Sequence, residues 1–168
     1  MSLDVRMEEI AEQDLPPVQY RWDADTDILC AILRPAGVSE GLSGSMDIEG
    51  ADGAWLTLEL SGGRLAAIEV AVWPDVKIVE PLSPPVAAGA ARLRVPSSGA
   101  DAGLEALEVN TLIRAIADKA EQTIHFRIGP QRSSRALRVA RDLMIEVDSR
   151  SCISGLWLLN VPPFPTAP

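Results

Sequence analysis

Residues 56–74 read LTLELSGGRLAAIEVAVWP, and this stretch decides the fold class. Every second residue from Leu56 to Leu60 is leucine, which is typical of a strand with one buried face. Ser61–Gly63 is a hairpin turn signal, and Arg64–Trp73 is a second run of β character closed by proline. A three-residue loop puts the leucines on one face with Ala66, Ile68, Val70 and Val72. A loop one residue shorter would set Leu56 opposite Glu69, so the pattern favours the three-residue loop.

A second stretch, LMIEVDSRSCISGLWLLNVP at residues 143–162, has the same order of features. Glu59 aligns with Glu146, Ile68 with Leu156, and the closing prolines coincide. Upstream, residues 18–22 align with residues 123–127. The matches predict an internal duplication, although hairpins share composition and a chance match is the alternative.

Between the two stretches the apolar period changes. Six apolar residues fall within one sector at about 100° per residue, whereas Arg114, Asp118, Lys119 and Glu121 fall outside it. The six are Val109, Leu112, Ile113, Ile116, Ala117 and Ala120. This pattern predicts an amphipathic helix over Asn110–Gln122. The predicted fold is therefore α+β, mostly β, with two pseudo-repeated antiparallel β-meander units and one helix between them. The predicted segments are an N-terminal segment (1–17), a first unit (18–85), a connector with the helix (86–122), a second unit (123–163) and a Pro-rich tail (164–168).

Charge is distributed unevenly along the 168 residues, whose formal net charge is −9. Residues 1–90 carry 5 basic and 16 acidic groups, a net charge of −11, and residues 91–168 carry +2. Phosphates repel an acidic chain, so no nucleic-acid partner is expected. No apolar run approaches the roughly 20 residues of a bilayer span, and the acidic start MSLDVRMEEIAEQD lacks a signal-peptide pattern. We therefore expect a cytoplasmic protein with no membrane partner.

The acidic stretch WDADTD, Trp22–Asp27, lies between two strand-like runs. Its three aspartates alternate like calcium ligands, but no glycine occupies the sixth position and Arg34 occupies the twelfth. Aspartate favours turns because its side chain bonds local N–H groups, so the stretch predicts a hairpin turn. The two cysteines and the one histidine form no zinc pattern, and we expect no metal and no cofactor.

No residue pattern indicates catalysis. Glu59 and Glu69 are candidates for an acid–base pair, but the three-residue loop sets them several pairs apart. His125 is the only histidine and lies on the polar side of its strand. No nucleophile motif accompanies it, so we expect no catalytic residue and no enzyme.

Tryptophans and arginines are the interaction candidates. In the predicted registers Trp55, Trp73, Trp157 and Leu159 lie on the face opposite the leucine rows, so both faces of each sheet are partly apolar. A twelve-residue helix is about 18 Å long and covers one unit, so a second chain would cover the other, which predicts a homodimer.

The densest basic set lies in the second unit and comprises Arg127, Arg132, Arg135, Arg138 and Arg141. It is either a solvated face or a surface for an anionic partner. Such a partner could be the acidic first unit of another copy, where Glu59 and Glu69 lie.

A family resemblance rests on VQYRWDADTDILCAIL and WLTLELSGGRLAAIEV, which together lie within residues 18–72. The chain resembles the small bacterial domain-of-unknown-function family numbered twenty-two eighty-three through Glu59, Gly63, Arg64, Ile68 and Glu69. The resemblance implies a small β-meander, no established activity and no catalytic residues. Some members are encoded beside toxin-like proteins.

Together these features predict a non-enzymatic protein-interaction or structural module that self-associates. One alternative is an antitoxin-like protein that binds a basic partner through its acidic first half. A second alternative is a small hydrolase or ligand-binding protein with a cleft between the units.

Overall fold

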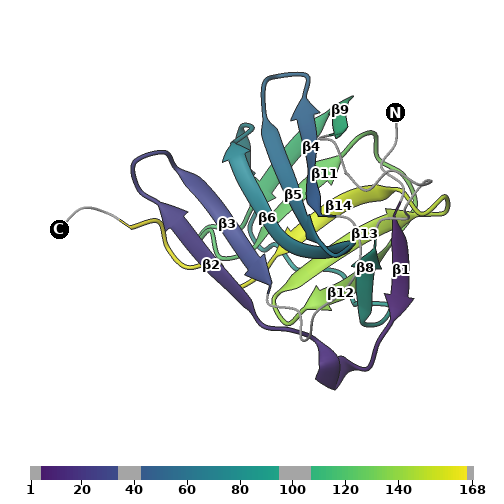
Figure 1. The fold of residues 1–168 in the computed structure, drawn as a ribbon. Coiled ribbons are helices and arrows are strands. Elements are labelled where there is room, and N and C mark those ends of the chain that lie inside the picture. Colours follow the sequence, from purple (N-terminus) through teal and green to yellow (C-terminus); the bar gives the residue numbers. More distant parts are fainter. Residues whose placement is uncertain (1–4, 34–42, 95–106, 166–168) are drawn as a thin grey trace.

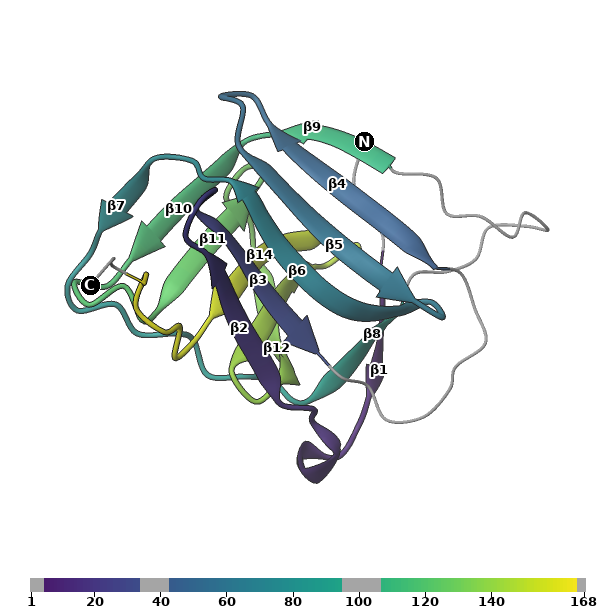
Figure 2. The ribbon, with the colours of Figure 1, turned by 60° about the vertical axis from the view of Figure 1, so that its left-hand side comes forward.

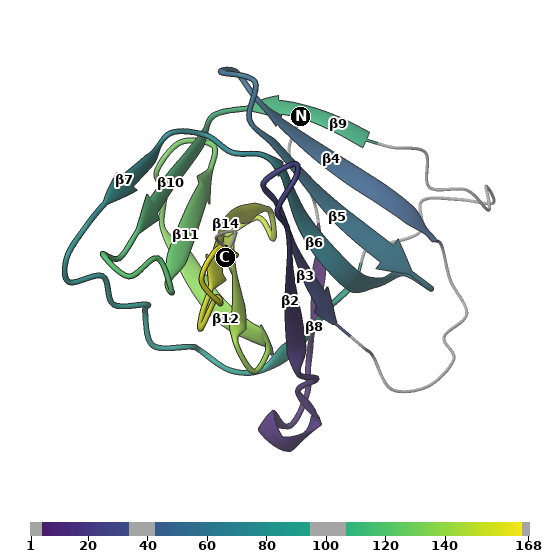
Figure 3. The ribbon, with the colours of Figure 1, turned by 90° about the vertical axis from the view of Figure 1, so that its left-hand side faces the viewer.

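Two β-sheets enclose one hydrophobic core in the computed structural model, which describes residues 5–33, 43–94 and 107–165 (Figure 1). Figure 3 shows the two sheets on either side of this core, so each sheet has one inner and one outer face. Residues 1–4 of the predicted N-terminal segment and 166–168 of the predicted tail lie outside the description.

The first sheet contains eight strands in the order β1-β8-β6-β5-β4-β9, and β2-β3 branches from β6. The branch is possible because β6 is long: its first residue, Arg64, pairs with Arg94 of β8, and its middle pairs with β3. The strands of this sheet are β1 (Arg6–Glu9), β2 (Val18–Asp23), β3 (Ile28–Leu33), β4 (Gly44–Gly50), β5 (Trp55–Ser61), β6 (Arg64–Val72), β8 (Ala91–Arg94) and β9 (Leu107–Thr111).

The second sheet contains six strands in the order β12-β13-β14-β11-β10-β7 (Figure 2). Its pairs are antiparallel except for β10 with β7. The strands are β7 (Val76–Ile78), β10 (Ile113–Ala117), β11 (Ile124–Ile128), β12 (Ser134–Ala140), β13 (Leu143–Asp148) and β14 (Ile153–Leu158).

The predicted amphipathic helix over Asn110–Gln122 is wrong. This segment contains the end of β9, the strand β10 and a turn, and the only helix in the described residues is the three-residue 3-10 helix η1 (Glu12–Asp14). Ile113, Ala115 and Ala117 are buried, and Leu112, expected inside, is 50% exposed. Ile113 and Ala117 of the predicted helix face also fit a period of two with Ala115, and pairing with β11 and β7 decides between the two periods. The α+β fold class is therefore corrected to a nearly all-β fold with two sheets.

The hairpin between β5 and β6 has a shorter turn than predicted. Ser61 pairs with Arg64, so Gly62 and Gly63 alone form the turn, and both have positive φ values, 60° and 75°. This turn alone would set Leu56 opposite Glu69. A bulge between Glu59 and Leu60 shifts the register, so that Leu56 pairs with Val70. Burial of the leucine row therefore determines the register and the backbone adapts to it.

Five consecutive strands of each sheet share one topology. β2 to β6 occur in the spatial order β4-β5-β6-β3-β2, and β10 to β14 occur in the order β12-β13-β14-β11-β10. In this correspondence β5 matches β13 and β6 matches β14. Glu59 pairs with Ala67 and Glu146 pairs with Gly155, so the two glutamates occupy equivalent positions. The strand β2 matches β10, whereas the sequence comparison aligned it with residues 123–127 of β11. The mismatch arose because β10 was interpreted as a helix.

Aromatic side chains close one end of the space between the sheets. Trp22 and Trp73 stack with their ring centroids 5.7 Å apart, and Trp73 also contacts Phe126 of the second sheet. Phe164 packs edge-on against Trp22, so the described part of the tail is laid against this end. The WDADTD stretch is a hairpin turn, as predicted, in which the N–H of Asp25 donates to Asp23 Oδ1 at 3.0 Å. The structure contains no helix of sufficient length and apolarity to cross a membrane in the described residues.

Candidate anion-binding groove on the second sheet

Strand alternation places a polar cluster on the outer face of the second sheet. Ile124, Phe126 and Ile128 of β11 point into the core, so His125 and Arg127 point outward. On β13 the buried Ile145 and Val147 leave Glu146 on the outer side. The strand β14 lies between them and contributes Gly155 and Trp157.

Glu146 is the centre of this cluster. Its Oε1 lies 2.5 Å from His125 Nε2 and accepts a hydrogen bond of 2.9 Å from Trp157 Nε1. The imidazole of His125 also stacks on the Trp157 ring, with centroids 4.3 Å apart. Three side chains from three neighbouring strands are thereby fixed relative to one another.

Gly155 makes this arrangement possible. A Cβ atom at this position would lie 2.5 Å from Glu146 Oε1, 2.9 Å from His125 Nε2 and 3.1 Å from the Phe126 carbonyl oxygen. The histidine and the carboxylate therefore meet across the space that a side chain of β14 would fill. A glycine within a buried strand commonly marks such a close approach.

The pKa of Glu146 reflects two opposing effects. Burial raises its pKa, but the hydrogen bond and charge of His125 and the hydrogen bond from Trp157 outweigh burial and lower it. Glu146 is therefore ionised at neutral pH, and its Oε1 is already committed to two partners.

A groove of about 310 Å³ lies beside this cluster. Its lining residues are Arg114, Ile116, His125, Arg127, Pro130, Gln131, Arg132, Ser134, Glu146 and Ser154. Three of these residues are arginines, so positive charge surrounds the ionised Glu146 in the groove.

The three arginines of the groove differ in what they bind. Arg132 uses four of its five N–H donors: its Nε donates to Asp148 at 2.7 Å, and its terminal nitrogens donate to the carbonyls of Ile128, Pro130 and Ile153. Arg127 has a buried Nε with no hydrogen-bond partner among the described residues, and Arg114 is exposed. Of the three ion pairs in the described residues, none includes Arg114 or Arg127. These two guanidinium groups therefore remain available to an anion.

Hydroxyl groups are present but do not form a nucleophile relay. Ser134 Oγ and Ser154 Oγ lie 2.6 Å apart and bond to each other. No hydrogen bond within the described residues joins either hydroxyl to His125. The same residues contain no group of three His, Cys, Asp or Glu side chains placed to hold a metal ion.

Part of this outer face is covered by the segment that precedes β8. The covered part includes Trp157, Leu159 and Arg138. Ala136, Met144 and Trp157 form a small apolar cluster, and Leu82, Ala87 and Leu159 pack against it. The connector is held there by hydrogen bonds from Ala88 N to the Ala136 carbonyl at 2.8 Å and from Arg138 N to the Gly89 carbonyl at 2.9 Å. The connector therefore does part of the covering that was assigned to a helix or a second chain.

The outer face of the first sheet is acidic. Four residues, Asp47, Thr57, Glu69 and Cys30, form one row across four strands. Glu59 lies two residues along β5 from Thr57, on the same face. Glu59 and Glu69 are therefore diagonal neighbours and not several pairs apart, because of the bulge. Glu69 Oε2 accepts a bond of 3.7 Å from the Cys30 thiol. Burial, followed by the charge of Glu69, raises the pKa of Cys30.

The two remaining tryptophans of the prediction differ in position. Trp55 is half-buried on the outer side of β5, next to the fully buried Leu56. Trp73 packs on the core and donates through its Nε1 to the Asp27 carbonyl at 2.7 Å. Trp73 therefore closes the end of the sandwich and is not part of an outer face.

The structure thus brings together Arg127 and Trp157 of the predicted set and adds residues that the sequence did not indicate. These are Glu146, Gly155 and Arg114. Gly155 carried a usable signal, since an isolated glycine within an apolar strand suggests that another group approaches closely.

Comparisons with known proteins give no identification. A scan against protein-family models finds no match to this chain, and a search of curated proteins also finds none. The resemblance to the β-meander family therefore stays a prediction.

Proposed function

We propose that this protein is a non-enzymatic protein-interaction module whose groove on the second sheet binds carboxylate groups of a partner. One observation carries the proposal: Arg114 and Arg127 line the groove and form no ion pair with a carboxylate among the described residues, while Glu146 is committed to His125 and Trp157. Guanidinium groups recognise carboxylates through paired, charge-assisted hydrogen bonds.

We propose a second copy of the chain as the partner. The outer face of the first sheet offers Asp47, Glu59 and Glu69, with Asp47 held by a 2.9 Å hydrogen bond from the Thr57 hydroxyl. In the shared topology Asp47 corresponds to Arg138, so the two outer faces carry opposite charge at an equivalent position.

The two outer faces point away from each other (Figure 3). Contact between unlike faces is therefore heterologous, and it propagates unless the rotation closes a ring. A homodimer would instead require like faces or paired sheet edges. Light scattering during size-exclusion chromatography distinguishes these cases, since unlike faces give a concentration-dependent series of species larger than the dimer.

Charge reversal tests which residues carry the contact. Arg127→Glu should abolish the larger species, and Glu69→Arg should do the same, because each change creates like-charge repulsion. The double variant Arg127→Glu/Glu69→Arg should restore association, since complementarity returns with exchanged signs. Arg135→Glu is the matched control, because Arg135 is exposed on β12 outside the groove. A monomer at all concentrations, or no recovery in the double variant, contradicts self-association through these faces.

A second candidate function is suggested by the acidic face alone. Glu59 and Glu69 are diagonal neighbours on it, and an antitoxin-like role would use this face to bind a basic partner. Titration with a lysine-rich peptide tests this role: binding lost in Glu59→Gln/Glu69→Gln and kept in Arg127→Glu would favour it over self-association.

A further inference from the structure

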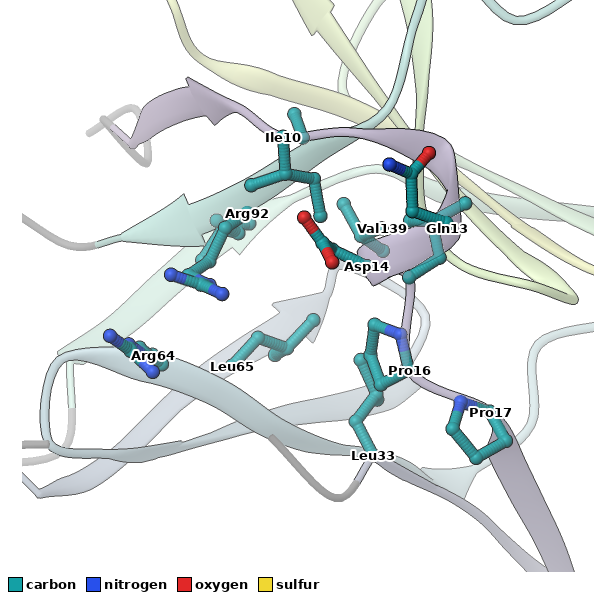
Figure 4. A pocket seen from close by; sticks show the side chains of 13 residues that line it. Ile10, Gln13, Asp14, Pro16, Pro17, Leu33, Arg64, Leu65, Arg92 and Val139 are labelled. Carbon is teal, nitrogen blue, oxygen red and sulfur yellow. The ribbon is translucent and has the colours of Figure 1, made fainter. Parts of the chain in front are cut away.

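A cavity of about 390 Å³, separate from the groove, lies where β3, β6, β8 and β12 meet (Figure 4). No lining residue is shared between this cavity and the groove. The segment Ile10–Pro17, which contains η1, forms one wall of the cavity.

The inner surface of the cavity is apolar and comes from both sheets. Leu33 and Leu65 belong to the first sheet, Val139 belongs to the second, and Leu15 and Leu93 complete the floor. All five side chains are at most 6% exposed, so the floor belongs to the packed interior. An apolar group of a ligand would gain the free energy of burial here.

The rim of the cavity carries two arginines. Arg64 begins β6 and Arg92 lies on β8, and Figure 4 shows both guanidinium groups on the same side of the cavity. Arg64 Nε is buried and has no hydrogen-bond partner among the described residues. Arg94 Nε is also buried without a hydrogen bond among the described residues, but it forms an ion pair with Glu8, whose Oε2 lies 3.1 Å away. Asp14 also lines the cavity, but no ion pair in the described residues joins it to Arg64 or Arg92.

The arginines of this rim repel one another. Burial, followed by the charges of Arg92 and Arg94, lowers the pKa of Arg64. The chain has a net charge of −9, yet the guanidinium groups of Arg64, Arg92 and Arg94 lie near one another here. Among the described residues the only carboxylate in an ion pair with them is Glu8, which contacts Arg94. An anion between Arg64 and Arg92 would relieve this repulsion and satisfy the buried Nε.

We propose that this cavity binds a small organic carboxylate with an apolar body, its carboxylate held by Arg64 and Arg92 and its body against the leucines of the floor. The volume lies in the lower part of the range for small-molecule pockets, so a single short chain or ring fits and a two-chain lipid does not. Asp14 faces the same space in Figure 4 and disfavours a second negative charge on the ligand.

The probe for this proposal is octanoate, measured by isothermal titration calorimetry on the full chain. Two ligands of the same chain length are controls: octan-1-ol lacks the charge, and octyltrimethylammonium carries the opposite one. We expect saturable one-to-one binding of octanoate, about tenfold or more tighter than that of octan-1-ol, as charge-assisted hydrogen bonds predict. Equal binding of octanoate and octan-1-ol, or no saturable binding of octanoate, overturns the proposal.

Three variants locate the site. Arg64→Gln/Arg92→Gln should reduce octanoate affinity at least tenfold, whereas Arg135→Gln, which removes one exposed positive charge elsewhere, should leave it unchanged. Asp14→Asn should strengthen octanoate binding about twofold to threefold, as removal of one solvent-screened like charge predicts. A gain of affinity cannot result from misfolding, so this variant keeps the test informative if the arginine double variant is unstable. Unchanged affinity in the arginine double variant, or weaker binding in Asp14→Asn, overturns the assignment.

The result is separable from the proposed function. Arg127→Glu, which disrupts the groove on the second sheet, should leave octanoate binding unchanged. Loss of octanoate binding in that folded variant would place the ligand in the groove and overturn the assignment to this cavity.

Discussion

Replacement of Gly155 by alanine is the most informative perturbation of the second sheet. The new Cβ would lie 2.5 Å from Glu146 Oε1, 2.9 Å from His125 Nε2 and 3.1 Å from the Phe126 carbonyl oxygen. The φ angle of Gly155 lies outside the left-handed region, so backbone strain does not contribute to the cost. The whole effect therefore comes from steric overlap with these three atoms.

The size of the effect follows from what must move. Glu146 has to leave its position, which breaks its hydrogen bonds with His125 and Trp157, at about 0.5–1.5 kcal/mol each. The Phe126 carbonyl belongs to the strand β11 and can shift only with its neighbours, which adds an overpacking cost of about 1–3 kcal/mol. We expect Gly155→Ala to lower the free energy of unfolding by about 2–4 kcal/mol. At this chain length that is a fall in Tm of roughly 5–15 °C.

Urea unfolding followed by far-ultraviolet circular dichroism measures this change. Gly89→Ala is the matched control, because a Cβ at Gly89 has no atom within 4 Å and its φ is not positive. We expect the control to lie within about 0.5 kcal/mol of the wild type or slightly above it. Glu146→Ala completes a double-mutant cycle, in which the cost of Gly155→Ala should shrink by about 1–3 kcal/mol.

Two results would refute this reasoning. Gly155→Ala could unfold within about 0.5 kcal/mol of the wild type, which would mean that the sheet accommodates the methyl group. Alternatively, the effects of Gly155→Ala and Glu146→Ala could add to within about 0.3–0.5 kcal/mol, which would mean that the two residues do not compete for one space.

Three further predictions concern Glu146, Tyr20 and Arg132. The folded-state pKa of Glu146 is lowered, so its ionised form adds stability above the ordinary pKa of 4.5, and this contribution disappears as the pH falls through the folded value. Wild type should therefore lose more unfolding free energy than Glu146→Gln below pH 4.5, and parallel pH profiles would contradict this. Tyr20→Phe should cost about 1–3 kcal/mol, since the hydroxyl donates to the Asp142 carbonyl at 2.7 Å and accepts from Leu159 N at 3.1 Å. Burial raises the pKa of Tyr20, the only tyrosine, so its stabilising effect is lost as the pH rises above 10.0, and phenolate absorbance should appear only together with unfolding. Arg132→Met should lower Tm, because three carbonyls and Asp148 lose a donor, and a Tm equal to that of Arg135→Met would contradict that role.

The candidate groove could be predicted from the sequence only in part. Strand alternation places His125 and Arg127 outward and leaves Ile124 and Phe126 for the core, and this much follows from β11 alone. The partner of His125 could not be predicted, because Glu146 lies on β13 and the two side chains meet across a third strand. The hairpin pattern of residues 143–162 predicts that β13 pairs with β14, but the sequence contains no signal that places β11 on the other side of β14.

The first sheet shows the same division. The leucine row of β5 correctly predicted which face is buried. A three-residue loop was expected to give the required register, whereas the structure reaches it with a two-residue turn and a bulge. Both solutions bury Leu56 and Leu58. Only the second makes Glu59 and Glu69 diagonal neighbours, so a local backbone feature determined the charge pattern of the outer face.

What the sequence by itself determined is the set of local preferences: alternating burial along β5, β6, β11 and β13, the turn at Asp23–Asp27 and the proline boundaries. Those features depend on a few neighbouring residues and on the contrast between apolar and polar side chains. What only the tertiary structure decided is the state of residues 113–117, where Ile113 and Ala117 fit both a helical period and a period of two. Hydrogen bonds to β11 and β7 selected the strand, since those partners come from segments distant in the chain or beyond a turn. The local pattern of apolar residues cannot predict this stabilisation, because the hydrogen bonds between strands form only when the sheet assembles.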